Sequence, residues 1–124
     1  MAKHDSDLSL IFQALSDPTR RAMLARLGHE GCGGRAVPVT ELARPTGLAL
    51  PTVLRHLAVL ENAHLISTEK TGRTRLCRVR PDTLAATEDW LAQQRALWEA
   101  RTDRLEDLLN ALKDDDDDAF QPRT

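Results

Sequence analysis

The amino-acid sequence predicts a mainly α-helical protein with one small β-hairpin and a long C-terminal helix. Over most of the chain, apolar residues recur every three or four positions, as they do on one face of a helix. Between residues 66 and 80, threonine and valine become frequent and a glycine turn interrupts the segment, which is typical of a hairpin. From residue 81 to about residue 113 the helical spacing returns. The 124 residues suffice for one compact domain, which we place at residues 1–112.

Two helices are expected near the N-terminus. The first covers about residues 7–15, and the second begins within "SDPTRRAMLARLG". Asp17 can cap the second helix, and Pro18 suits its first position because proline has no N–H that needs a partner. Gly28 is expected to end this helix. A glycine-rich loop and a short extended piece at residues 37–39 should follow.

The middle of the chain is predicted to form two helices joined by a tight turn. "TELARPTG" should form a short helix that begins near Thr40 and turns at Gly47. The next helix is expected at residues 51–62, with Pro51 at its first position. Its buried stripe should consist of three residues at helical spacing: Val53, Leu57 and Leu60. Such a pair of helices is a helix-turn-helix.

The predicted hairpin lies in the most basic part of the chain. Residues 51–80 hold six Lys or Arg residues and two Glu residues, whereas residues 81–124 hold five basic and twelve acidic residues. This asymmetry favours nucleic-acid binding, although a solvated charged face has the same composition. The tip and second strand of the hairpin are expected to carry most of the cations: Lys70, Arg73, Arg75, Arg78 and Arg80.

The C-terminal helix is expected to need a partner surface. Leu91, Trp98, Leu105 and Leu112 are seven residues apart, and Leu108 widens their stripe. A helix over about residues 82–112 would be about 45 Å long at 1.5 Å per residue, too long for so small a domain to cover. Packing on its own domain is the alternative. We favour a second copy of the helix, with Leu91, Trp98, Leu105 and Leu108 at the dimer contact.

The last segment, "KDDDDDAFQPRT" at residues 113–124, is expected to be an acidic, disordered tail. Five consecutive aspartates repel one another and face the negative end of the helix dipole.

The order of these elements is that of a winged helix-turn-helix, and several motifs resemble the arsenic-repressor (ArsR) family of bacterial transcriptional regulators. The similar stretches are "ALSDPTRRAMLARL", "VTELA", "LPTVLRHLAVLENAHLI" and "GRTRLCRVRPDTL", together with the helix "DWLAQQRALWEARTDRLEDLL". The resemblance covers about residues 8–110. It implies a homodimer that places one recognition helix per subunit, residues 51–62, in the major groove of double-stranded DNA, with the hairpin at residues 66–80 as a wing beside the backbone or in the minor groove.

The outward face of the expected recognition helix supplies candidate DNA contacts. Placing residues at 100° intervals turns Thr52 and Arg55 outward, with His56 at the margin. Arg55 suits guanine, because its fork matches the O6 and N7 acceptors, and Thr52 can contact a base or a thymine methyl. His56 either contacts a phosphate or forms a hydrogen bond at the core margin. On the wing, Lys70, Arg73 and Arg75 can reach phosphates, although charge also protects exposed strand edges.

This face departs from the common family pattern. Many relatives have Ser or Gln at the positions of Ala49, Leu50 and Leu54, and Lys at that of Ala58, so few polar groups remain here to read bases. We expect specificity to depend on few base contacts, methyl packing and DNA shape.

The sequence predicts no metal site or cofactor. Pro38 and Thr40 occupy the positions of the usual Cys pair, and the C-terminal helix contains no histidine. Cys32 and Cys77 form no metal motif, and they are read either as inert thiols or as a redox pair between the loop and the hairpin. The sequence does not specify an effector.

A dimeric repressor that binds an inverted-repeat operator is therefore the leading hypothesis. The alternative is a winged-helix protein-interaction module that has lost DNA reading. An enzyme is excluded because no nucleophile–base pair, metal set or cofactor loop is present in the sequence. We expect the protein to be cytoplasmic and not associated with membranes, since the sequence has neither a signal-peptide pattern nor an apolar run of spanning length.

Overall fold

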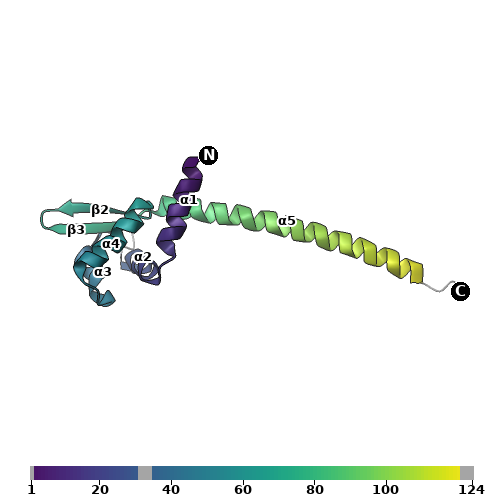
Figure 1. Ribbon diagram of the computed structural model, residues 1–124, viewed down its shortest axis with the longest axis horizontal. Coiled ribbons are helices and arrows are strands. Elements are labelled where there is room, and N and C mark those ends of the chain that lie inside the picture. Colours follow the sequence, from purple (N-terminus) through teal and green to yellow (C-terminus); the bar gives the residue numbers. More distant parts are fainter. Residues whose placement is uncertain (1, 31–34, 121–124) are drawn as a thin grey trace. The chain divides into compact units, whose positions relative to one another are not determined.

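The computed structural model describes residues 2–30 and 35–120, with side chains for residues 7–29 and 35–114. The chain divides into two units, residues 1–87 and residues 88–124. Within the described residues, helices and strands follow one another in the predicted order, and the hairpin strands of a small antiparallel sheet lie between the fourth and fifth α-helices (Figure 1). The predicted fold class, mainly α with a winged helix-turn-helix and a long C-terminal helix, is therefore confirmed.

Helices α1 (Ala2–Leu15) and α2 (Pro18–Glu30) form the N-terminal part of the first unit. As predicted, Pro18 opens α2 and Asp17 caps it, because the Asp17 Oδ2 atom accepts a hydrogen bond from the Arg20 backbone N–H at 3.0 Å. This bond lowers the pKa of Asp17, since it favours the ionised carboxylate. Two expected boundaries were wrong. The first helix begins at Ala2 rather than near residue 7, and the second continues through Gly28.

Gly28 does not end α2 because its φ is not positive, and a glycine ends a helix chiefly by adopting the left-handed conformation. That conformation occurs instead at Gly47, with φ 68°, between the two helices of the helix-turn-helix. The first of these, α3 (Val39–Ala43), starts directly after the two-residue strand β1 (Val37–Pro38) and leads into a 3-10 turn, η1 (Arg44–Thr46).

The predicted cap at Thr40 was wrong. Pro38 occupies the N-cap position of α3, without a capping side-chain hydrogen bond, and Thr40 lies inside the helix. The short extended piece also ends at Pro38 rather than at residue 39.

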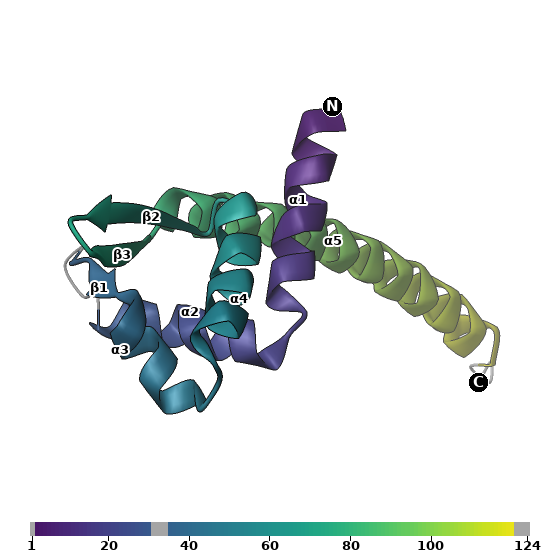
Figure 2. The ribbon, with the colours of Figure 1, turned by 60° about the vertical axis from the view of Figure 1, so that its left-hand side comes forward.

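The second helix of the motif is α4 (Leu50–Asn62), which begins after the extended residue Ala49. Pro51 therefore lies at the second helical position, one later than predicted, and its missing N–H is still one that no helical carbonyl needs. The predicted stripe of Val53, Leu57 and Leu60 is buried. Helix α4 contacts α1, α2, α3 and the first hairpin strand, so it lies at the centre of its unit (Figure 2).

A tight corner joins α4 to the wing. His64 adopts a left-handed φ of 61°, and its N–H donates to the Glu61 carbonyl at 2.9 Å while the Leu65 N–H donates to the Leu60 carbonyl at 3.0 Å. This is the Schellman pattern, in which left-handed backbone after the helix satisfies its last carbonyls. Strand β2 (Ile66–Thr71) starts two residues after the left-handed one.

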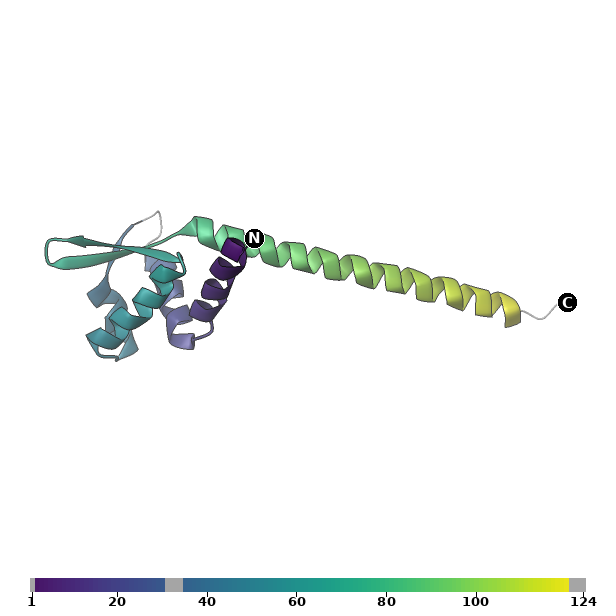
Figure 3. The same cartoon turned by 45° about the horizontal axis from the view of Figure 1, so that its top comes forward.

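The wing consists of β2 and β3 (Thr74–Val79), joined by the two-residue loop Gly72–Arg73. Gly72 has a φ of 62°, which short hairpin loops require and glycine tolerates. The sheet order is β1-β3-β2, and Val37 on β1 pairs with Cys77 on β3. The hairpin extends past α3 and α4, so its tip is clear of the helices (Figure 3). Arg80 follows β3 rather than belonging to it.

The core of the first unit gathers apolar side chains from every α-helix and strand before α5. Its most enclosed members come from α2, α3, α4, the α4–β2 corner and the sheet: Leu27, Leu42, Leu60, Leu65, Ile66, Val37, Val53 and Cys77. Burial of such side chains is the main source of stability for a domain of this size. The core also fixes the orientation of α4, because the buried stripe of α4 is part of the core.

The last helix, α5 (Pro81–Phe120), begins in the first unit and provides most of the second. Its start is tied to the corner after α4, since Thr83 Oγ1 donates a hydrogen bond to the His64 carbonyl and the Arg80 N–H donates to the Leu65 carbonyl at 2.9 Å. The predicted helix end near Lys113 was wrong, because helix continues to Phe120. Disorder of the acidic segment stays a prediction, and residues 121–124 of that segment lie outside the described residues.

None of the helices in the described part of the chain is both long and apolar enough to cross a membrane.

Candidate nucleic-acid interface

The helix α4 presents an inner face, an outer face and two lateral edges, because successive residues are turned by about 100°. The inner face is the buried stripe, and the opposite face is exposed at Pro51, Arg55 and Ala58. One lateral edge, which carries Thr52 and His56, is half-buried. The other edge carries Leu50, Leu54 and Glu61 and faces the wing.

Arg55 lies where the sequence predicted, exposed on the outward face of α4. Among the hydrogen bonds and ion pairs that the structure records for described residues, none engages its guanidinium. The fork is therefore available for a planar acceptor pair such as the O6 and N7 atoms of guanine. Thr52, three residues earlier, is half-buried and points less directly outward than predicted.

His56 has a structural partner that the sequence did not identify. Arg20 Nη1 lies 3.3 Å from His56 Nδ1, and a guanidinium only donates, so Nδ1 accepts this bond and the proton of the neutral ring is on Nε2. The same Arg20 donates to the carbonyls of Ala14 at 2.8 Å and Gln13 at 3.0 Å, which are at the end of α1. Of the two roles considered for His56, the hydrogen bond at the core margin is the one observed.

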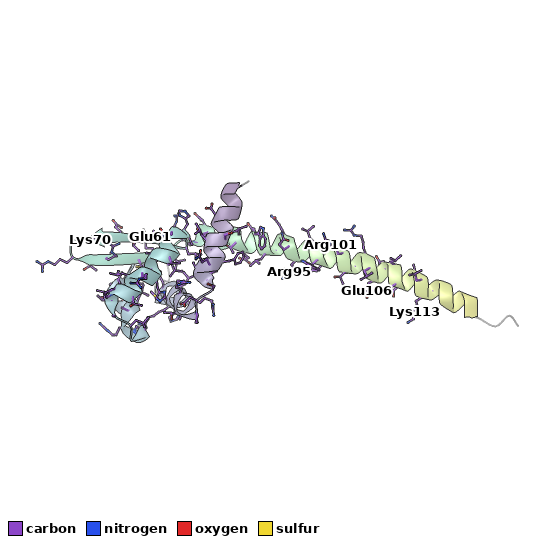
Figure 4. The ribbon with its side chains drawn as sticks, viewed as in Figure 1. Glu61, Lys70, Arg95, Arg101, Glu106 and Lys113 are labelled. Carbon is purple, nitrogen blue, oxygen red and sulfur yellow. The ribbon has the colours of Figure 1, made fainter. Side chains whose placement is uncertain are left out.

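The face of the wing that is turned toward α4 changes in polarity from its base to its tip. Because side chains alternate along a strand and Thr68 pairs with Cys77, one face carries Ile66, Thr68 and Lys70 on β2. The same face carries Val79, Cys77 and Arg75 on β3. It changes from buried apolar residues at the base to cations at the tip, and Lys70 projects outward from the free end of the hairpin (Figure 4).

A groove separates the start of α4 from the wing tip. It has a volume of about 280 Å³ and is lined by Val39, Thr40, Leu50, Leu54, Lys70, Arg73, Thr74 and Arg75. Leu50 and Leu54 remain 47% and 39% exposed in this groove, which is otherwise lined largely by basic and polar side chains. Lys70, Arg73 and Arg75, the three wing cations that the sequence analysis selected, all line this groove. The neighbouring leucines were noted only as departures from the family pattern, since their contact with the groove depends on how the hairpin packs.

Cys77 has an enclosed position, which disfavours redox chemistry, and a redox pair with Cys32 stays a prediction. Its side chain is fully buried in the sheet, and burial raises the pKa of the thiol to about 11, with a further upward contribution from Glu61. Because the thiolate is the reactive species, a protonated and enclosed thiol is inert at neutral pH. Cys32, its predicted partner, lies outside the described residues. The described residues also contain no cluster of three or more His, Cys, Asp or Glu side chains that could hold a metal ion.

The dimerisation residues predicted on α5 are all exposed in this single chain. They are Leu91, Trp98, Leu105 and Leu108, and the neighbouring Leu97, Leu109 and Leu112 are exposed as well. The guanidinium carbon of Arg101, which occupies a seam position, lies 6.0 Å from the centre of the Trp98 ring. This spacing is at the outer limit of a cation–π contact.

Comparisons with known proteins agree with this architecture. A family model described as "Helix-turn-helix domain" matches residues 15–69. The HTH-type transcriptional regulator Rv2034 of Mycobacterium tuberculosis is 40% identical over 75 residues, which are 60% of this chain, and the chain spans 65% of that regulator's length.

Two solved structures extend the similarity to most of the chain. An ArsR family transcriptional regulator is 45% identical, with a TM-score of 0.69, over 77% of this chain and 93% of its own. An ArsR-like transcriptional regulator from Rhodococcus sp. RHA1 is 26% identical, with a TM-score of 0.71, over 86% of this chain and 95% of its own. With this identity over nearly the whole length of a relative, and with the winged helix-turn-helix described above, the chain belongs to the ArsR family of transcriptional regulators.

Proposed function

We propose that this regulator is a homodimeric repressor that binds an inverted-repeat operator, with α4 in the major groove and the wing along the backbone. The observation that carries the proposal is the outward face of α4, where the exposed Arg55 is the one cation of the helix and no recorded contact engages its guanidinium. The planar Arg55 guanidinium projects from the exposed face of α4, and such a group is suited to read a base edge.

The wing supports the backbone part of the proposal. Lys70 and Arg73 lie at and beside the hairpin tip and line the groove between the wing and α4, where long cationic side chains can reach phosphates. Neutralising phosphates releases counterions, so these contacts strengthen binding to any duplex and make it dependent on salt. Arg55 would then supply sequence preference, and the wing would supply affinity.

The dimer rests on the exposed apolar stripe of α5. Trp98 and Leu105 are 66% and 57% exposed in the single chain, and side chains of this size in a repeating row are typical of an interface. Seven-residue spacing is the pattern that allows two helices to pack along each other, and two recognition helices are needed to read two half-sites.

The experiment compares Arg55→Ala and Arg55→Lys with the unmodified protein on a DNA site recovered by in vitro selection and on random DNA, by fluorescence anisotropy. Loss of a bidentate base contact should weaken binding to the selected site by about 1 to 3 kcal/mol. Binding to random DNA should change little. Arg55→Lys keeps the charge but loses the fork, so it should behave like alanine at the selected site.

Equal losses on both DNAs, or full rescue by lysine, would show that Arg55 supplies charge and reads no base. Failure of the unmodified protein to bind any duplex at low salt would favour the alternative function, a winged-helix module that contacts another protein.

A further inference from the structure

The seam between the recognition helix and the wing contains a chain of hydrogen bonds. Thr68 Oγ1 on β2 lies 2.6 Å from Glu61 Oε2 on α4, and Arg75 Nη1 on β3 lies 3.4 Å from the same Thr68 Oγ1. A hydroxyl has one proton and two lone pairs, so Thr68 donates to the carboxylate and accepts from the guanidinium. The chain therefore links three secondary-structure elements through one side chain. Glu61 lies on the wing side of α4 (Figure 4).

The surroundings show that these groups line one pocket, which is open to solvent. A cavity of about 230 Å³ is lined by Leu54, Leu57, Ala58, Glu61, Thr68 and Arg75. Thr68 and Glu61 are half-buried. Both Glu61 and Arg75 affect the pKa of the buried Cys77 thiol, in opposite directions, which is consistent with their position beside this strand.

Two arginines of the wing, Arg73 and Arg75, have different surroundings. Arg73 lies in the hairpin loop, and none of the hydrogen bonds recorded for described residues involves it. Arg75 lies on the strand face that turns toward α4, and its guanidinium reaches back along the wing to Thr68. A cation directed at a hydroxyl of the protein itself is less free to follow a DNA phosphate.

We infer that Glu61, Thr68 and Arg75 form a clamp that fixes the wing against the recognition helix, and that Arg75 is a positioning residue and not a phosphate contact. The part of this inference that concerns DNA rests on the proposed function. The clamp sets the distance between the base-reading face of α4 and the phosphate-binding tip at Lys70 and Arg73. Loosening it would cost affinity on any DNA without removing a phosphate contact.

The first test uses the free protein, so it does not depend on DNA binding. Thr68→Val keeps the shape of the side chain and its preference for strands but removes the hydroxyl, whereas Thr68→Ser keeps the hydroxyl and is the matched control. Amide hydrogen exchange across residues 66–79 should become several-fold faster in Thr68→Val and stay near wild type in Thr68→Ser. Unchanged exchange in Thr68→Val would overturn the clamp.

The second test measures the dissociation constant against salt on one duplex. Arg73→Ala should lower the slope of log K against log salt by about 0.9, the value for one phosphate contact on duplex DNA. Arg75→Ala should weaken binding about five-fold, as expected for one net hydrogen bond of about 1 kcal/mol, with less than half of that slope change.

A double-mutant cycle completes the test. Thr68→Val and Arg75→Ala should not add, because either change opens the same clamp, whereas Thr68→Val and Arg73→Ala should add. Full additivity of Arg75→Ala with Thr68→Val, together with a slope loss equal to that of Arg73→Ala, would make Arg75 a phosphate contact and overturn its assignment. If the unmodified protein bound no DNA, the proposed function would fail, and the exchange experiment would still decide the clamp.

Discussion

The first unit and the distal part of α5 use similar apolar residues in opposite ways. In residues 7–87, the leucines and valines of the core are almost completely enclosed, with Leu60 at 0% exposure and Leu27 at 1%. In residues 88–114, Trp90 is half-buried, and all the other large apolar side chains are exposed. The difference teaches that the first unit encloses an apolar core of its own, whereas the distal part of α5 carries a row of exposed apolar side chains, which is typical of an interface.

The largest expected effect is the loss of the dimer on Leu105→Asp. An unpaired charge in an apolar contact costs several kcal/mol, so the protein should sediment as a monomer at micromolar concentration. Operator binding should be lost with the dimer, because two half-sites are read together. Ala96→Asp is the matched control, since nine residues at 100° place it on the opposite side of the helix. A tight dimer of Leu105→Asp would show that α5 does not carry the contact at this stripe.

The contribution of the buried core of the first unit is tested by Leu60→Ala. Removing a fully buried leucine should lower the free energy of unfolding by about 2 to 5 kcal/mol, measured by urea denaturation at fixed protein concentration. Leu97→Ala on α5, at an exposed position, should change the unfolding of a monomeric Leu105→Asp background by less than about 0.5 kcal/mol. Similar losses for the two substitutions in that background would remove the distinction between the units.

Cys77 provides a chemical probe of the same enclosure. In a Cys32→Ser background, iodoacetamide at pH 8 should leave folded protein unmodified and label one thiol after unfolding in urea, as read by mass spectrometry. Since the pKa of the folded thiol is raised from 9.0 to about 11, the unfolded chain loses its proton first, and stability should fall as pH rises through that interval. Rapid labelling of the folded protein would revive the redox hypothesis for Cys32 and Cys77.

The smallest expected effect concerns the acidic end of α5. If the aspartates at residues 114–118 compete with phosphates for the wing cations, deletion of residues 114–124 should modestly tighten binding to random DNA at low salt. The gain should disappear as salt screens the attraction. Identical affinities with and without this segment at low salt would leave it a solvated tail.

Much of the fold could be predicted because it depends on periodicity. The stripe Val53, Leu57 and Leu60 gave the direction of the recognition helix, and its spacing is independent of the rest of the chain. Helix ends were harder, because they depend on backbone conformation. Gly28 stays helical, whereas His64, a residue type that adopts positive φ far less readily than glycine, takes the left-handed conformation after α4.

The candidate site was predictable one element at a time. Arg55 is exposed on α4 as its helical position indicated, and the wing cations lie on the hairpin. Contacts between elements were not predictable, since they depend on strand register and on how the hairpin packs. The bond from Arg20 to His56 and the chain from Arg75 through Thr68 to Glu61 are of this kind.

The two ends of the wing differ in how much sequence change they can absorb. At its base, the Schellman bonds at His64 and Leu65 and the bond from Thr83 leave no spare residue between α4 and β2, so an added residue there would turn every side chain of β2 to the opposite face. At its tip, only Gly72 and Arg73 separate the strands, and the loop extends past the helices. A short tag for labelling or capture can therefore be inserted at the tip without disturbing the core, whereas an insertion of the same length at the base would cost the fold.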